Sequence, residues 1–290
     1  MLKVGVLGLG HLGKIHLNCI NKISQYKLTG IFDTNEKLAA KVSAEYNVPF
    51  YASAEALIDA VDVVDIVTPT ITHYELAKKV LEKGKHFFIE KPITHTLEEA
   101  QSLCELLKNQ PIKVQVGHVE RFNPALLAIE NKNISPMFIE AHRLAMFNPR
   151  GTDVSVVLDL MIHDLDIILK LIPHKIAKIE ASGVAIVSST ADIANARIEF
   201  ENGAIVNITA SRISMKNMRK LRVFQSDAYL SLDFLNKKTE IVRIHNTIPT
   251  GKENCMELHT NNGTRFSSCT RIKRRSWWLR NFISCRPKVK

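Results

Sequence analysis

One short segment of the sequence carries side chains suited to proton transfer. Asp159, His163 and Asp166 are spaced so that they share one face of a helix. A histidine titrates near neutral pH and can take the proton of an alcohol while hydride leaves its carbon, and Asp159, one turn earlier, can orient the ring. The alternatives are a divalent metal site, a structural histidine between two acids, or a solvated acidic face.

A lysine occupies a second place suited to catalysis. Lys91 lies between Glu90 and Pro92, directly after the apolar run of residues 86–89, and the proline fixes the backbone there. Its ammonium group can hydrogen-bond a substrate hydroxyl or share a proton with it. The alternative is a solvated surface lysine.

A glycine-rich loop of the form G-x-G-x-x-G joins a short apolar run to a segment with helical spacing. It consists of Gly8, Gly10, His11, Leu12 and Gly13 with Leu9. Such glycines allow a tight turn, the approach of a pyrophosphate and close helix packing. Asp33 ends the next apolar segment, where a carboxylate binds the ribose hydroxyls of NAD and repels the 2′-phosphate of NADP. We therefore expect NAD rather than NADP, although Asp33 could also cap the helix that follows.

The elements that must position these side chains alternate between strand and helix in the first part of the chain. Apolar runs end at the glycine loop, at Asp33, at Thr68-Pro69-Thr70 and at Glu90-Lys91-Pro92. Parallel strands bring their carboxyl ends to one edge of a sheet, which is where ligands bind. The expected fold class is α/β, with a Rossmann dinucleotide-binding domain over residues 1–120.

Near Pro124 the pattern changes to strands of alternating polarity with one long helix, expected over residues 154–172. We expect an α+β substrate and oligomerisation domain over residues 121–264, with a large, mostly antiparallel sheet. Patterned sequence stops near Thr264, so this domain is expected to be incomplete. Residues 265–290 are expected to form a basic, unpatterned tail, either an out-of-frame translation or an unrelated extension. The rival hypothesis is a tail that binds a membrane surface or RNA.

Composition and charge bound the function. The net charge of +10 arises in the tail, where nine basic residues and no acidic ones follow Thr264, so the body is nearly neutral and nucleic-acid binding by it is not expected. No apolar run is long enough to span a membrane, and no signal peptide precedes the first strand, so the expected location is cytoplasmic. The five cysteines show neither paired nor metal-binding spacing, and we expect no metal.

Taken in order, these motifs resemble the glucose-fructose oxidoreductase, inositol dehydrogenase and rhizopine-catabolism (Gfo/Idh/MocA) family over about residues 1 to 260. The resemblance rests on the glycine loop, Asp33, Thr68-Pro69-Thr70 with His73, Glu90-Lys91-Pro92 and Asp159-x-x-x-His163. Members of that family are NAD(P)-dependent sugar or cyclitol dehydrogenases with two domains. The resemblance implies that Lys91 and His163 are the catalytic pair supported by Asp159. It also implies that Thr68, Pro69, His73 and Glu90 lie near the cofactor, and that the sheet of the second domain makes a homo-oligomer.

Two longer stretches, residues 117–124 and 149–153, look like the bacterial branch that includes UDP-N-acetylglucosamine 3-dehydrogenases. By this resemblance the substrate is a UDP-N-acetyl amino sugar whose 3-hydroxyl is oxidised to a ketone. Arg121, Arg143 and Arg150 are candidates for contact with its diphosphate, and each has an ion pair as its alternative role. The alternative functions are an inositol or free-hexose dehydrogenase and a non-catalytic NAD-binding sensor.

Overall fold

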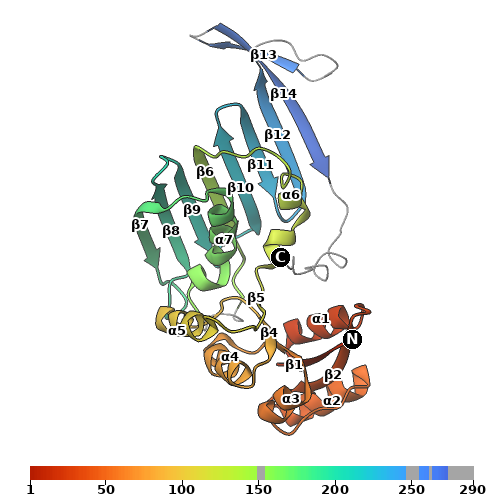
Figure 1. Ribbon diagram of the computed structural model, residues 1–290. Coiled ribbons are helices and arrows are strands. Elements are labelled where there is room, and N and C mark those ends of the chain that lie inside the picture. Colours follow the sequence, from red (N-terminus) through yellow and green to blue (C-terminus); the bar gives the residue numbers. More distant parts are fainter. Residues whose placement is uncertain (149–153, 246–254, 261–262, 274–290) are drawn as a thin grey trace. The chain divides into compact units, whose positions relative to one another are not determined.

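A computed structural model describes residues 1–148, 154–245, 255–260 and 263–273 (Figure 1). The chain divides into two compact units, Met1–His118 and Val119–Lys290. Each unit is built around its own sheet and is described by itself below.

The first unit is a parallel sheet of five strands in the order β2-β1-β3-β4-β5. Its strands are β1 (Leu2–Leu7), β2 (Tyr26–Phe32), β3 (Val63–Ile66), β4 (His86–Ile89) and β5 (Val114–Val116). Its helices are α1 (His11–Ile20), α2 (Glu36–Tyr46), α3 (Ala54–Ala60), α4 (His73–Glu82) and α5 (Leu97–Leu107), with the 3₁₀ turn η1 (Thr70–Thr72). This strand order confirms the predicted Rossmann arrangement, in which the order of the parallel strands reverses between β1 and β3.

Successive residues of β1 point to opposite faces of this sheet, and each face has its own core. Val4 and Val6 pack with apolar side chains of α1 and α2, whereas Leu7 packs with those of α3, α4 and α5. The helices begin where the sequence offers caps: the side chains of Asn35, Ser53 and Thr96 accept backbone N–H groups of α2, α3 and α5. Asn35, rather than Asp33, is therefore the cap of α2, which corrects the alternative role considered for Asp33.

The second unit is a sheet of nine strands in the order β13-β14-β12-β11-β10-β6-β9-β8-β7. Its strands are β6 (Phe138–Leu144), β7 (Ile176–Val184), β8 (Ile193–Phe200), β9 (Ile205–Ser211), β10 (Met218–Gln225), β11 (Ala228–Asp233), β12 (Lys238–His245), β13 (Cys255–Thr260) and β14 (Gly263–Lys273). All pairings are antiparallel except that of β6 with β9. Its helical segments are η2 (Val119–Phe122), α6 (Pro124–Leu127), η3 (Val157–Met161) and α7 (Ile162–Leu171).

The core of the second unit lies on one face of its sheet, beneath α6, η3 and α7 (Figure 1). Ile167 and Ile168 of α7 are buried there against Ala196, Ile198 and Ile208 of the neighbouring strands, which alternate with outward-facing polar residues. The prediction of a large, mostly antiparallel sheet covered on one face by a helix is confirmed.

Two details differ from the sequence-based expectation. The single helix expected over residues 154–172 consists of a π-helical segment, η3, followed by α7, because a periodicity of apolar residues does not distinguish the wider turn. Residues 265–273, assigned to the unpatterned tail, belong to β14. The sequence pattern did not indicate this strand because two of its buried positions are the polar residues Ser267 and Ser268, so it lacks the alternation of apolar residues. The rest of the tail lies outside the described residues.

Within the part of the chain that the structure describes, no helix combines the length and the apolar character needed to cross a bilayer.

Candidate functional site

The glycine loop between β1 and α1 has the backbone geometry that a dinucleotide requires. Gly8 has a φ of +95°, which only glycine adopts readily, and a side chain at Gly13 would collide with the carbonyl oxygen of Gly8. Gly10, by contrast, has no atom of the described residues within 4 Å of the place where its Cβ would lie. The second glycine therefore leaves an open cradle at the N-terminus of α1, where the N–H groups of the first turn, at His11 and Leu12, have no partner within the helix.

The carboxylate of Asp33 stands beside this loop, held by two backbone donors. The N–H of Leu9 donates to Oδ2 and the N–H of Asn35 donates to Oδ1, both at 2.8 Å. Each carboxylate oxygen has a further lone pair, which can accept a ribose hydroxyl. The residues present thus fit NAD at this edge of the sheet.

The ends of β3 and β4 are joined by a buried histidine. His73 is 1% exposed, and its Nδ1 and Nε2 lie 2.8 and 2.9 Å from the carbonyl oxygens of Pro92 and Thr68. Both ring nitrogens thus face carbonyl oxygens of the chain itself, and the placement of His73 near the cofactor stays a prediction. We assign it a positioning role for the loops of Thr68 and Lys91. Pro69 is exposed beside Thr68.

A second buried histidine lies beneath Lys91. Nδ1 of His16 lies 2.9 Å from Oδ2 of Asp65, and Nε2 lies 3.2 Å from Oε1 of Glu90. Burial alone lowers the pKa of His16, but the charges and hydrogen bonds of Asp65 and Glu90 outweigh it and raise the pKa to about 10. The imidazole is therefore a cation between two acids. Glu90, predicted to lie near the cofactor, is itself buried, and its Oε2 accepts the backbone N–H of Lys91 at 3.2 Å.

Sequence reasoning missed His16 and Asp65, although each carries a signal. Asp65 is a charged residue in the middle of an otherwise apolar strand, and such residues are rarely buried without a partner. His16 stands on the same face of α1 as Gly13, Leu17 and Ile20, the face that packs on the sheet. Pairing the two would have required knowing that α1 covers β3.

In the second unit, His163 and Asp159 lie at the junction of η3 and α7. Asp159 belongs to the π-helical segment and His163 to the first turn of α7, and both side chains are half-buried. Such local π-helical turns are frequent at functional sites. Among the described residues, no group of three or more His, Cys, Asp or Glu side chains is arranged to hold a metal ion.

The residue after His163 anchors this helix in the core. Asp164 is 2% exposed and accepts two hydrogen bonds from Arg143 of β6, Nε to Oδ2 at 2.9 Å and Nη2 to Oδ1 at 2.7 Å. Nη1 of Arg143 donates to Glu120 at 3.2 Å. Burial disfavours the charge on Arg143, but these two acids raise its pKa above the ordinary value.

Arg143 was a candidate for contact with a substrate diphosphate, with an ion pair as the alternative. The structure shows the ion pair. Its guanidinium is 2% exposed, and both of its ends are engaged by acids of its own unit. In the sequence, Arg143 follows Ile139 and Ala141 at a spacing of two residues, which places it on the buried face of β6, but the strand does not reveal the acids that pair with it.

Arg121 is the second of the predicted diphosphate contacts. It pairs with Asp166 of α7, with Nε donating to Oδ2 at 2.7 Å and Nη2 donating to Oδ1. Its side chain remains 44% exposed, so it is accessible to a ligand. Together with the buried cluster of Arg143, this pair links η2 to the part of α7 that follows His163. Arg150 lies outside the described residues.

Comparison with known proteins places both units. Residues 2–118 match the model of an oxidoreductase family with an NAD-binding Rossmann fold, and residues 140–231 match the GFO/IDH/MocA C-terminal domain. The UDP-N-acetylglucosamine 3-dehydrogenase of Acidithiobacillus ferrooxidans is 41% identical over 241 residues, which cover 83% of this chain and 76% of that protein. The solved structure of that enzyme matches this chain with a TM-score of 0.78 at 40% identity, over 83% of this chain and 79% of that chain.

More distant relatives act on other polyols. The scyllo-inositol 2-dehydrogenase (NAD(+)) of Bacillus subtilis is 30% identical over 232 residues, which cover 73% of this chain and 68% of that protein. A levoglucosan dehydrogenase, solved in complex with NADH and levoglucosan, has a TM-score of 0.76 at 21% identity, covering 83% of this chain and 76% of that chain. At that identity the likeness concerns the fold alone.

We expect Gly10→Ala to weaken NAD binding about tenfold or more without lowering the thermal midpoint, because the added methyl group occupies only the open cradle. Gly13→Ala is the contrasting variant and should lower the thermal midpoint, because its methyl group meets the Gly8 carbonyl. Calorimetric titration with NAD and thermal unfolding measure the two effects. Unchanged NAD affinity in Gly10→Ala would contradict the assignment of the cradle.

Arg143→Met should lower the free energy of unfolding by about 3–5 kcal/mol, because it leaves Asp164 buried without its partner. Arg121→Met should cost less than about 1 kcal/mol, since its pair with Asp166 is partly exposed to water. Urea unfolding followed by circular dichroism compares the two variants. Equal losses in both would show that the buried cluster does not have the structural role assigned to it.

Proposed function

Because this chain belongs to the Gfo/Idh/MocA family of NAD-binding oxidoreductases, we propose that it oxidises the 3-hydroxyl of a UDP-N-acetyl amino sugar to a ketone. The family membership makes it an NAD-dependent dehydrogenase of sugar hydroxyls. The observation that carries the finer proposal is its similarity to a UDP-N-acetylglucosamine 3-dehydrogenase through both units rather than through the nucleotide-binding unit alone.

The residues of the first unit would hold the cofactor. The open cradle at Gly10 takes the pyrophosphate, Asp33 takes the ribose hydroxyls, and the ends of β3 and β4, at Thr68, Pro69 and Glu90, border the nicotinamide side. A bound NAD supplies a hydride acceptor at C4 of its nicotinamide ring. The carboxylate of Asp33 would repel a 2′-phosphate, which favours NAD over NADP.

Two side chains of this chain handle the proton of the substrate hydroxyl. His163 accepts that proton on a ring nitrogen, and Asp159 orients the ring and stabilises its charge. The role proposed for Lys91 is a hydrogen bond from its ammonium group to the substrate hydroxyl, which would stabilise the negative charge that develops during the oxidation. Arg121, with its exposed edge, and Arg150 are the residues we propose for the diphosphate of the substrate.

Two alternatives remain distinct in their predictions. An inositol or free-hexose dehydrogenase would need no diphosphate contact, and the likeness to a scyllo-inositol 2-dehydrogenase favours it as the second candidate. A non-catalytic NAD-binding sensor would use the same cradle without turnover.

The deciding assay incubates the full chain with NAD and a panel of UDP-sugars, inositols and hexoses, and follows reduced nicotinamide by absorbance. UDP-N-acetyl sugars should give the highest kcat/KM, and Lys91→Met and His163→Ala should each lower kcat by about 10²–10⁴-fold. Lys27→Met and His174→Ala remove exposed residues of the same types and serve as matched controls. Turnover that survives both site substitutions would refute the assignment, and NAD binding without any turnover would favour the sensor.

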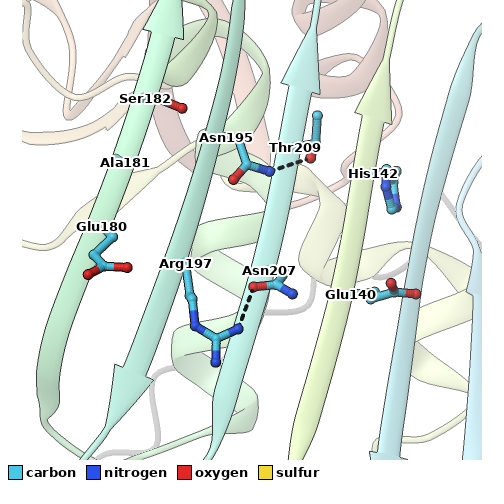
Figure 2. Close-up of a pocket in the computed structure, with 9 residues that line it drawn as sticks. All are labelled: Glu140, His142, Glu180, Ala181, Ser182, Asn195, Arg197, Asn207 and Thr209. Carbon is cyan, nitrogen blue, oxygen red and sulfur yellow. Dashed lines mark hydrogen bonds between the residues drawn. The ribbon is translucent and has the colours of Figure 1, made fainter.

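We also propose that the uncovered face of the large sheet binds a second copy of the chain. A polar hollow of about 520 Å³ lies on this face. Figure 2 shows the side chains of β6, β7, β8 and β9 that line it. Asn195 donates to Thr209 at 2.8 Å and Arg197 donates to Asn207 at 3.2 Å within the hollow. Aromatic rings lie on neighbouring strands of the same face, at Phe138, Phe224 and Tyr229. Exposed aromatics beside ordered polar groups are typical of protein interfaces.

Thr209→Lys, which places a longer and charged side chain in this hollow, should shift the protein to a smaller species in sedimentation velocity, because that side chain would have to lose its water between the two copies. Met215→Lys changes a 91% exposed loop residue and is the control. A wild-type protein that sediments as a monomer at high concentration would contradict the proposed interface.

A further inference from the structure

The buried cluster of His16, Asp65 and Glu90 brings ionisable groups together in the interior of the first unit. Three ionisable side chains, each less than 10% exposed, meet between α1, β3 and the end of β4. Replacing buried ion pairs by apolar residues is often neutral or stabilising, so such a cluster is weak evidence for a contribution to stability. Oδ1 of Asp65 is buried and makes no hydrogen bond with the described residues, which is a further cost.

The topology explains why these groups meet. Asp65 pairs in register with Phe88 on the adjacent strand, and Glu90 follows Phe88 by two residues. The side chains of Asp65, Phe88 and Glu90 therefore point to the same face of the sheet, the one that α1 covers. His16 reaches that face from the second turn of α1, and its ring packs edge-on against Phe88, with centroids 5.4 Å apart. The histidine is thus confined by its two acids and by an aromatic wall.

Glu90 transmits this confinement to the next residue. One of its oxygens faces His16, and the other accepts the backbone N–H of Lys91. On the far side of Lys91, the carbonyl of Pro92 lies against the ring of His73. The backbone from which the Lys91 side chain departs is therefore held from both sides by buried groups.

Gly117 supplies independent evidence that the carboxylate of Glu90 must keep its place. A Cβ at residue 117 would lie 2.8 Å from Oε1, 2.9 Å from Cδ and 3.0 Å from Oε2 of Glu90. Only glycine leaves room for the carboxylate in this orientation, between the end of β5 and His16.

We propose that His16, acting through Glu90, is a positioning residue that fixes Lys91 for the reaction. His16 touches neither the hydroxyl nor the nicotinamide in this scheme; it sets where the backbone of Lys91 lies, and hence where its ammonium group can reach. The proposal rests on the role assigned to Lys91 in the proposed function. Misplacement of a catalytic group by about 1 Å costs on the order of 10²-fold in rate, so the effect is measurable.

Two variants disturb the cluster in different ways. His16→Leu combined with Asp65→Val removes the imidazole together with its buried acid, and so avoids leaving Asp65 as an isolated charge. Gly117→Ala retains every charge and displaces only the carboxylate of Glu90. The matched control is Gly5→Ala, whose Cβ would lie 3.0 Å from the side chain of Leu57 on the opposite face of the same sheet.

The readouts separate positioning from stability and from the proposed function. Both cluster variants should lower kcat by about 10²-fold with little change in the KM of the sugar or in NAD affinity. Hydrogen exchange of the segment containing the Lys91 amide should accelerate about tenfold, whereas that of β2 stays unchanged. Gly5→Ala should show neither effect.

The proposal would be overturned if Gly117→Ala left both the hydrogen exchange of the Lys91 segment and kcat as in the wild type. It would also be overturned if the loss of kcat only followed the loss of thermal stability. If the double variant does not fold, Gly117→Ala decides alone. Exchange needs no substrate, so a wild-type protein without turnover would refute the proposed function while leaving this test in force.

Discussion

Charge enclosed in a protein interior is the constraint on which both units depend. An ionised group can be buried only if opposite charges and hydrogen bonds replace the water that it loses, and these partners must come from different elements. In the first unit the cation of His16 joins α1 to β3 and to the end of β4. In the second, the cation of Arg143 joins β6 to α7 and to η2.

Each of the two clusters contains a carboxylate that is adjacent in sequence to a residue proposed to act in the reaction. Glu90 immediately precedes Lys91, and Asp164 immediately follows His163. In each case the buried carboxylate belongs to the chain neighbour of the residue proposed to act, so the buried charge pair anchors the backbone beside that residue. The side chains of Lys91 and His163 are themselves only partly buried.

Much of the fold follows from patterns that are local in the sequence. The glycine loop, the run that ends at Asp33 and the β-branched strand before Thr68 are each defined by adjacent residues, and the family match confirms the Rossmann unit and NAD as its cofactor. What local patterns could not reveal is which charged residues are buried. Arg143 was expected to bind a ligand, and His16 was overlooked, because their partners lie 21 to 74 residues away in the chain. β14 was not predicted for a similar reason. It is defined by its pairing with β12, and its buried residues Ser267 and Ser268 are polar.

The parallel pairing of β6 with β9 limits where residues can be inserted between these two strands. Parallel neighbours require the chain to travel back along the full length of the strand before it can run forward again. β6 has seven residues, about 23 Å, and the ten residues of α7 rise about 15 Å, to which η3 adds a further turn, so the helical segments and the strand are similar in length. A single inserted residue in the helix would turn everything beyond it by about 100° and break that match. A change of length would therefore disturb this match least in the connecting loops, and the orientation of His163 depends on the dimensions of the sheet on which its helix packs.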